Sequence, residues 1–171
     1  MLLEAHKIFA NLSWILLIVI LISRPLAEIV GNKILFRFLR YRKRMGIACG
    51  LAAISHVVFF LIGSGLLGVY FSDPMFWSPN TFFGWGSLAL VAMFFPLLTS
   101  NNFSLRYFGR HWKKIQRLAY LVFVATAVHV AMVKNDWLTV VAPTTVWLLL
   151  WVWAEIKRVK KNSANNIEKY C

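Results

Sequence analysis

Five long apolar segments constrain this chain more than any other feature of its sequence. They cover residues 3–26, 45–70, 82–98, 115–133 and 137–156. A helix of about 20 apolar residues matches the hydrocarbon thickness of a bilayer. Hydrophobic residues make up 60% of the 171 residues and charged residues only 15%, more apolar surface than a soluble domain of this length buries. The sequence therefore predicts an all-α integral membrane protein, a bundle of five transmembrane helices.

The basic residues lie in the pattern that a membrane topology requires. They gather between the first and second segments, between the third and fourth, and after the fifth. In a five-helix zigzag these three stretches share one face, and Lys and Arg favour the cytoplasmic face. We therefore predict a multi-pass protein of the bacterial inner (cell) membrane, with its N-terminus outside and its C-terminus in the cytoplasm.

This topology also accounts for the net charge of +13. We expect membrane lipid, with its anionic headgroups, as the partner of the basic residues, and no nucleic acid. Residues 1–156 are predicted to form the transmembrane domain and residues 157–171 a basic and polar cytoplasmic tail. The first segment is expected to be a retained helix, because no small-residue cleavage site follows it. Cys49 and Cys171 match no metal or redox spacing, and Cys49 is expected in the core.

Two histidines, His56 and His129, lie inside the second and fourth segments with apolar neighbours on both sides. An ionisable side chain in the bilayer costs several kcal/mol unless it is paired or ligated. The two helices enter from the same face and hold their imidazoles at similar depths. Two imidazoles on facing helices are the usual axial ligands of a b-type haem. We therefore predict that His56 and His129 bind the iron of one haem b; the alternative is two separate interhelical hydrogen bonds.

The remaining signals for a site are weaker. Ala52 and Ala125 each precede a histidine by four residues, and we expect these small side chains to leave room for a flat macrocycle. His6 lies near the outer end of the first segment and His111 in a basic loop, and for both we expect solvated side chains. The chain has no phosphate-binding glycine loop, no zinc motif and no acid within the membrane for a serine triad, so no catalytic residue is predicted.

Two blocks of sequence resemble a known family. "ISRPLAEI" followed by "YRKRMGIACGLAAISHVVFF", and then "PLLTSNNFSLRYFGRHWKKIQRLAYLVFVATAVHVAMVKNDW", are similar to the ferric-reductase-like transmembrane family. Within that family they look most like the haem-bearing membrane subunits of periplasmic methionine sulfoxide reductase systems. The positions that match in the second block are Leu98, Thr99, Ser100, Arg106, Gly109, Trp112, Arg117, Leu118 and Tyr120. The resemblance covers roughly residues 18–156 and places the axial pair at His56 and His129.

The chain departs from the family pattern in two ways. Gln116 stands where the family has a histidine near the cytoplasmic face, and an amide is not a normal haem ligand. We therefore expect one haem and no second, inner haem at this position. The family has a six-helix core, and the first of those helices has no counterpart in this sequence. We therefore expect five spans.

By resemblance, the chain is a haem b subunit that carries electrons across the membrane to a periplasmic redox acceptor protein. The donor is expected to be a cytoplasmic flavin reductase or quinol, with FMN and quinone as further candidate ligands. As part of an oxidoreductase system, the chain is expected to have no complete catalytic site of its own. One alternative is a haem-binding anchor or assembly subunit of a larger complex. Another is a metal-ion reductase, which ranks last because the outer loops are short and poor in metal ligands.

Overall fold

The computed structural model describes the backbone of residues 1–134 and 137–170, together with the side chains of this part up to residue 160. Regular structure in this part of the chain is entirely helical. The long helices are α1 (Leu2–Val30), α3 (Arg42–Gly63), α4 (Phe82–Leu98), α7 (Leu118–Lys134) and α8 (Leu138–Tyr170). The short helices and 3-10 turns are α2 (Lys33–Phe38), η1 (Leu39–Tyr41), η2 (Pro74–Phe76), α5 (Asn102–Phe108), η3 (Gly109–His111) and α6 (Trp112–Gln116).

The long helices have the length and apolar character of membrane spans. Within the described residues, four stretches qualify: Leu2–Val30, Lys33–Gly63, Asn102–Lys134 and Leu138–Lys160. Helix α4 is also apolar, but its 17 residues are at the lower limit for a span. Between 11% and 28% of the residues in the four spanning windows are buried inside the protein. Most of the apolar surface therefore faces outward, as a bundle in lipid requires. The predicted all-α architecture is confirmed, with four helical stretches that could span a membrane and a fifth, shorter apolar helix.

Several helix boundaries differ from the sequence prediction. The second apolar segment, residues 45–70, is not one helix, because α3 ends at Gly63. Gly65 then takes a left-handed φ of 70°, and the N–H of Leu66 donates to the carbonyl of Leu61 at 2.9 Å. This is a glycine helix stop that hydropathy alone does not reveal. Helix α8 continues to Tyr170, so the backbone of the predicted tail is helical up to that residue; Cys171 lies outside the described residues.

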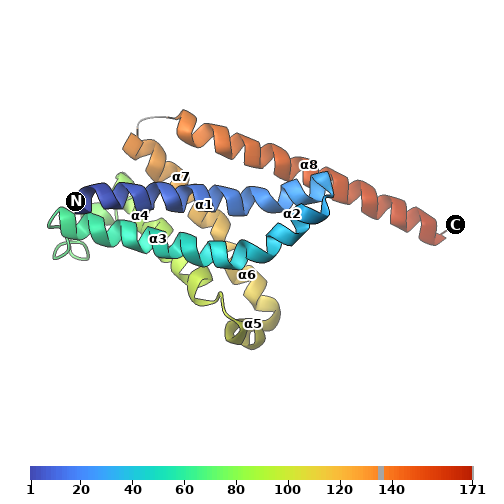
Figure 1. Ribbon diagram of the computed structural model, residues 1–171, viewed down its shortest axis with the longest axis horizontal. Helices are drawn as coiled ribbons and strands as arrows, with labels where there is room; N and C mark the ends of the chain where they lie inside the picture. Colours follow the sequence, from blue (N-terminus) through green and yellow to red (C-terminus); the bar gives the residue numbers. More distant parts are fainter. Residues whose placement is uncertain (135–136, 171) are drawn as a thin grey trace.

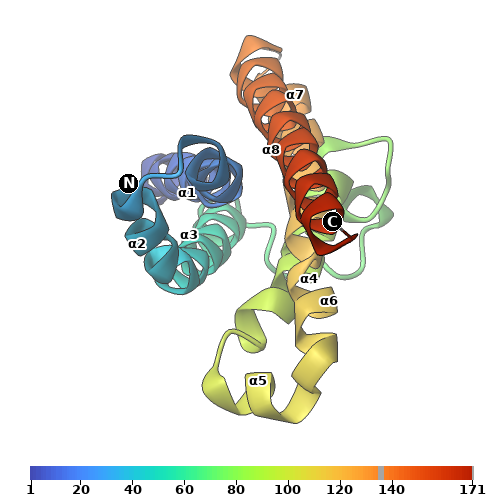
Figure 2. The same cartoon turned by 90° about the vertical axis from the view of Figure 1, so that its right-hand side faces the viewer.

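The long helices are arranged as two packed pairs with α8 beside them. Helices α1 and α3 form one antiparallel pair and α4 and α7 form the other, as Figures 1 and 2 show. Helix α8 packs mainly along α1. The core between the pairs includes Trp14 of α1 and Phe123 of α7, whose rings stack at 5.6 Å with an interplanar angle of 6°. Cys49 is 2% exposed in the same core, as expected.

The ends of the bundle differ in charge. The N-terminus, the α3–α4 connection and the end of α7 lie toward one end of the long axis in Figure 1. The basic stretches in α2, in α5 and α6, and in the C-terminal part of α8 lie away from that end. The zigzag inferred from the sequence is therefore present in the fold. The direction of the chain across a membrane stays a prediction.

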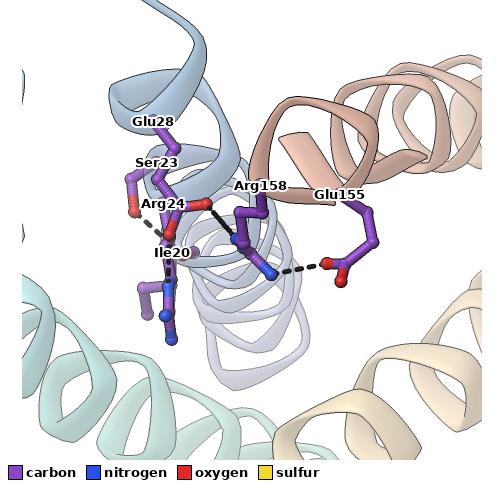
Figure 3. A network of polar contacts seen from close by, with 6 residues as sticks. All are labelled: Ile20, Ser23, Arg24, Glu28, Glu155 and Arg158. Carbon is purple, nitrogen blue, oxygen red and sulfur yellow. Dashed lines mark hydrogen bonds and ion pairs between the residues drawn. The ribbon is translucent and has the colours of Figure 1, made fainter. Parts of the chain in front are cut away.

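An ion-pair network joins α1 to α8 near the basic end. Glu28 of α1 accepts hydrogen bonds from Arg158 of α8, at 2.5 Å from Nη2 and 2.8 Å from Nε. Its other carboxylate oxygen accepts from Arg24 at 2.9 Å. Arg158 lies between Glu28 and Glu155 in Figure 3, and its Nη1 is 2.5 Å from the Glu155 carboxylate. One carboxylate thus binds two guanidinium groups and holds two helices together.

We expect Glu28→Gln to loosen α8 from α1, because an amide cannot neutralise two guanidinium groups. The thermal midpoint of the protein in detergent should fall by a few degrees, for a loss of about 1 kcal/mol. Glu4→Gln is the matched control, because Glu4 pairs with Lys7 at 3.0 Å inside one exposed helical turn and joins no two helices. Equal midpoints for the Glu28→Gln and unchanged proteins would contradict the role of the network.

Candidate cofactor site

A cavity of about 450 Å³ lies between the two helix pairs. Its volume is in the range of cofactor and small-molecule sites. Helices α1, α3, α4 and α7 all contribute to its wall. Helix α1 lines it only between His6 and Leu17, and α7 only between Val122 and Lys134. The cavity therefore occupies the half of the bundle that contains the N-terminus, away from the basic end.

Three histidines from three helices line this cavity: His6 of α1, His56 of α3 and His129 of α7. The ring centroids of His56 and His129 are 6.5 Å apart, and their planes meet at 69°. The rings of His6 and His56 are 5.5 Å apart with an interplanar angle of 27°. The structure thus brings together the two histidines that the sequence singled out, although 73 positions separate them along the chain.

The orientation of both predicted ligands is set by backbone carbonyls on neighbouring helices. Nδ1 of His56 lies 3.0 Å from the carbonyl oxygen of His6, and Nδ1 of His129 lies 2.7 Å from that of Phe82. A carbonyl only accepts, so Nδ1 carries the proton in each ring and neutral imidazole keeps its lone pair on Nε2. The interhelical hydrogen bonds considered from the sequence are therefore present. They are also the bonds that orient metal-binding histidines in proteins.

His6 is not the solvated side chain that the sequence suggested. Its Nδ1 is buried and has no hydrogen-bond partner among the described residues. Its ring lies 5.6 Å from that of Phe60, in addition to the contact with His56. The prediction was wrong because the antiparallel packing of α1 on α3 places the first turns of α1 beside the second half of α3. His111, by contrast, is exposed as expected.

The small residues that line the cavity are not the ones that the sequence predicted to leave room for a macrocycle. Ala52 and Ala125 are 4% and 0% exposed but do not line the cavity, because they are packed between helices. Gly86 and Ala89 of α4 and Ala53 of α3 line it instead. A small residue four positions before each histidine was expected to leave room for a macrocycle, but both of these alanines are buried away from the cavity.

Gly86 is a site residue that the sequence reading missed. A methyl group at this position would lie 2.9 Å from Nδ1 and 3.0 Å from Cε1 of His129. The absent side chain therefore lets α4 approach α7 closely enough for the His129 hydrogen bond to Phe82. The only sequence signal was a glycine within an apolar segment, which often marks close helix packing.

Gln116, at the position of the missing family histidine, has a structural role. Its Nε2 donates to the carbonyl of Pro96 at 3.2 Å and lies 3.1 Å from the hydroxyl oxygen of Thr99. Trp112 donates from Nε1 to the carbonyl of Thr99 at 2.8 Å. These bonds tie α6 to the end of α4, and Gln116 does not line the cavity. The residues at these family motif positions therefore stabilise the connection between α4 and α7, the two helices of the second pair.

The donor set of the site favours a macrocycle over a bare metal ion. Among the described residues no group of three or more His, Cys, Asp or Glu is arranged to hold a metal. Two imidazoles supply only two ligands, whereas a porphyrin supplies the four others of a six-coordinate iron. The wall of the cavity is mostly apolar, with Phe60, Phe83 and Leu90 among its members. The residues present therefore fit a flat, apolar, metal-containing group.

Comparison with known proteins gives concordant matches. The family model described as "Ferric reductase like transmembrane component" matches residues 7–127. The "Protein-methionine-sulfoxide reductase heme-binding subunit MsrQ" of Brucella ovis is 33% identical over 141 residues, which are 79% of this chain and 60% of the relative. The MsrQ proteins of Brucella canis and Brucella suis match equally well. The chain spans about three fifths of the length of these relatives. No solved structure matches the chain.

We expect Gly86→Ala to displace the His129 ring, because the added methyl group and the imidazole cannot share the space between α4 and α7. Such overpacking costs about 1–3 kcal/mol, and the thermal midpoint should fall. The Nδ1 proton of His129 should also lose the downfield NMR shift of a short hydrogen bond.

Gly46→Ala provides the matched control, since a methyl group there meets nothing within 4 Å in the same kind of helical setting. It should leave the midpoint unchanged or raise it, because alanine favours helix over glycine. A fall as large in Gly46→Ala as in Gly86→Ala would refute the steric explanation.

Proposed function

This chain belongs to the ferric reductase like transmembrane component family, and we propose that it is a haem b subunit carrying electrons across a bacterial inner membrane. In this proposal His56 and His129 would hold the haem iron. An imidazole nitrogen binds a metal at about 2 Å, so two imidazoles that held one metal between them would have ring centroids about 6 Å apart. The separation of 6.5 Å between the His56 and His129 rings is close to that value. This spacing, with both Nδ1 atoms already engaged, is the observation that carries the proposal.

In this proposal the protein positions the haem and shields it from water. Haem b, when bound, supplies a one-electron couple, and its potential depends on ligation and on the surroundings. The carbonyls of His6 and Phe82 orient the two imidazoles. Trp14 lines the cavity and stacks on Phe123, which is buried in the adjoining core, so an apolar ring stack borders the site.

The direction of electron flow is proposed from charge and from the relatives. The basic end of the bundle faces the cytoplasm in this proposal, because Lys and Arg favour that side. A positive surface there attracts an acidic flavin reductase, and quinol is the alternative donor. The cavity then lies in the outer half of the membrane, close to a periplasmic acceptor. MsrQ relatives are named as subunits of a methionine sulfoxide reductase, and we propose an acceptor of that class.

Replacing either axial histidine is the direct test of the ligand assignment. We expect His56→Ala and His129→Ala each to purify without the low-spin haem b spectrum, because one side of the iron loses its ligand. His111→Ala is the control, since that exposed histidine lies in the basic segment and should leave the spectrum intact.

His6 makes a further variant necessary, because its ring lies 5.5 Å from that of His56. If His56→Ala keeps haem through His6, the His6→Ala/His56→Ala double variant should lose it. A His56→Ala/His129→Ala protein with an unchanged spectrum would show that the iron binds elsewhere.

Electron transfer is tested in vesicles that contain the haem-loaded protein. We expect a quinol, or a flavin reductase with NADH, to reduce the haem from the basic end, and an oxidised periplasmic methionine sulfoxide reductase to reoxidise it from the other. Stopped-flow absorbance measures both steps, and vesicles with His56→Ala/His129→Ala are the control.

The alternatives have their own signatures in the same experiment. Haem that is inert to every donor favours an anchor or assembly subunit. Reoxidation by ferric or cupric ions alone favours a metal-ion reductase.

A further inference from the structure

The cavity has one cationic end and one apolar end. Among the residues that the structure describes, Lys7 of α1 and Lys134 of α7 are the charged residues of its wall, apart from the histidines, and none of the described carboxylates lines it. Lys7 lies near the start of α1 and Lys134 is the last residue of α7. Figure 1 shows these two helix ends toward the end of the bundle that contains the N-terminus. The opposite end of the cavity is lined by apolar side chains, among them Leu17, Met93 and Val122.

We propose that Lys7 and Lys134 form a carboxylate subsite at the mouth of the cavity and hold the two propionates of haem b. This inference rests on the proposed function and adds to it the orientation of the cofactor. A ligand with an apolar body and two carboxylates on one edge fits an apolar cavity with two cations at one end. Because the lysines come from different helix pairs, the bound carboxylates also link α1 to α7.

Both lysines are placed so that they can reach such a ligand. Lys7 is 61% exposed and its present partner, Glu4, is 74% exposed in the first turn of the same helix. Exposed ion pairs of this kind contribute little, so a ligand carboxylate can replace Glu4 at small expense. Lys134 is the last residue of α7 and is exposed. Long lysine stems let the ammonium groups reach a ligand at the mouth while the stems lie along apolar surface.

His6 supplies an independent indication of a ligand at this end. Its buried Nδ1 has no partner in the described part of the chain, although a polar atom buried in hydrocarbon normally finds one. The residue is next to Lys7 in sequence and lines the same cavity. A carboxylate held by the two lysines is an acceptor that this nitrogen otherwise lacks.

The test uses the full-length protein prepared without haem and titrated with haem b or with haem b dimethyl ester, in which both carboxylates are neutral. We expect the unchanged protein to bind the free acid about tenfold more tightly than the ester, as two charge-assisted contacts at a partly exposed site allow. Lys7→Gln/Lys134→Gln should lose this preference. Lys7→Arg/Lys134→Arg should keep it, because both charges remain.

The matched control is Lys33→Gln/Lys160→Gln, which removes the same charge from residues that do not line the cavity. It should discriminate between acid and ester as the unchanged protein does. A second readout is the haem midpoint potential, which should move to more negative values in Lys7→Gln/Lys134→Gln only, because fewer cations then face the reduced haem.

The possible outcomes separate this inference from the proposed function. Equal affinities for acid and ester in the unchanged protein, both with a bis-imidazole spectrum, overturn the carboxylate subsite alone. The carboxylate subsite is also overturned if Lys7→Gln/Lys134→Gln still binds the free acid as much more tightly than the ester as the unchanged protein does. The two lysines would then contact lipid phosphates instead. If neither compound gives the spectrum, the proposed haem function fails and the subsite fails with it.

Discussion

Polar nitrogens inside a bilayer need partners, and the interior of this protein is organised by that requirement. His56 and His129 lie among apolar residues, and each directs Nδ1 to a carbonyl of the helix packed beside it. Each bond lies within one helix pair, joining α3 to α1 and α7 to α4. The cavity opens where the two pairs face each other, so the rings meet across it. The same contacts therefore hold each pair together and aim both imidazoles at one space.

Close packing within each pair depends on small residues at particular places. Gly86 allows α4 to approach His129, and Ala125 and Ala52 are buried without lining the cavity. Between the pairs, large rings take over, as in the stack of Trp14 on Phe123. Trp14 belongs both to this core and to the wall of the cavity, so the core and the cavity adjoin each other.

The residues at the motif positions of the family divide into two groups. His56 and His129 face the cavity, whereas Trp112, Thr99 and Gln116 connect α6 to the end of α4. Replacing a family histidine by Gln116 substitutes a hydrogen-bonding amide that is satisfied locally. These motif positions can therefore keep their structural role without a histidine at position 116.

The sequence by itself determined the class of this protein. Apolar length, the positions of basic residues and two histidines in apolar segments predicted a helical membrane protein, its zigzag and the pair of imidazoles. Those properties are local, because hydropathy and charge act on each segment separately. Only the tertiary structure decided that His6 joins the site, that Gly86 rather than Ala52 or Ala125 makes room, and that lysines from two helix pairs line one cavity. Those facts depend on which helices pair and at what tilt, and side-chain packing between distant segments sets that pairing.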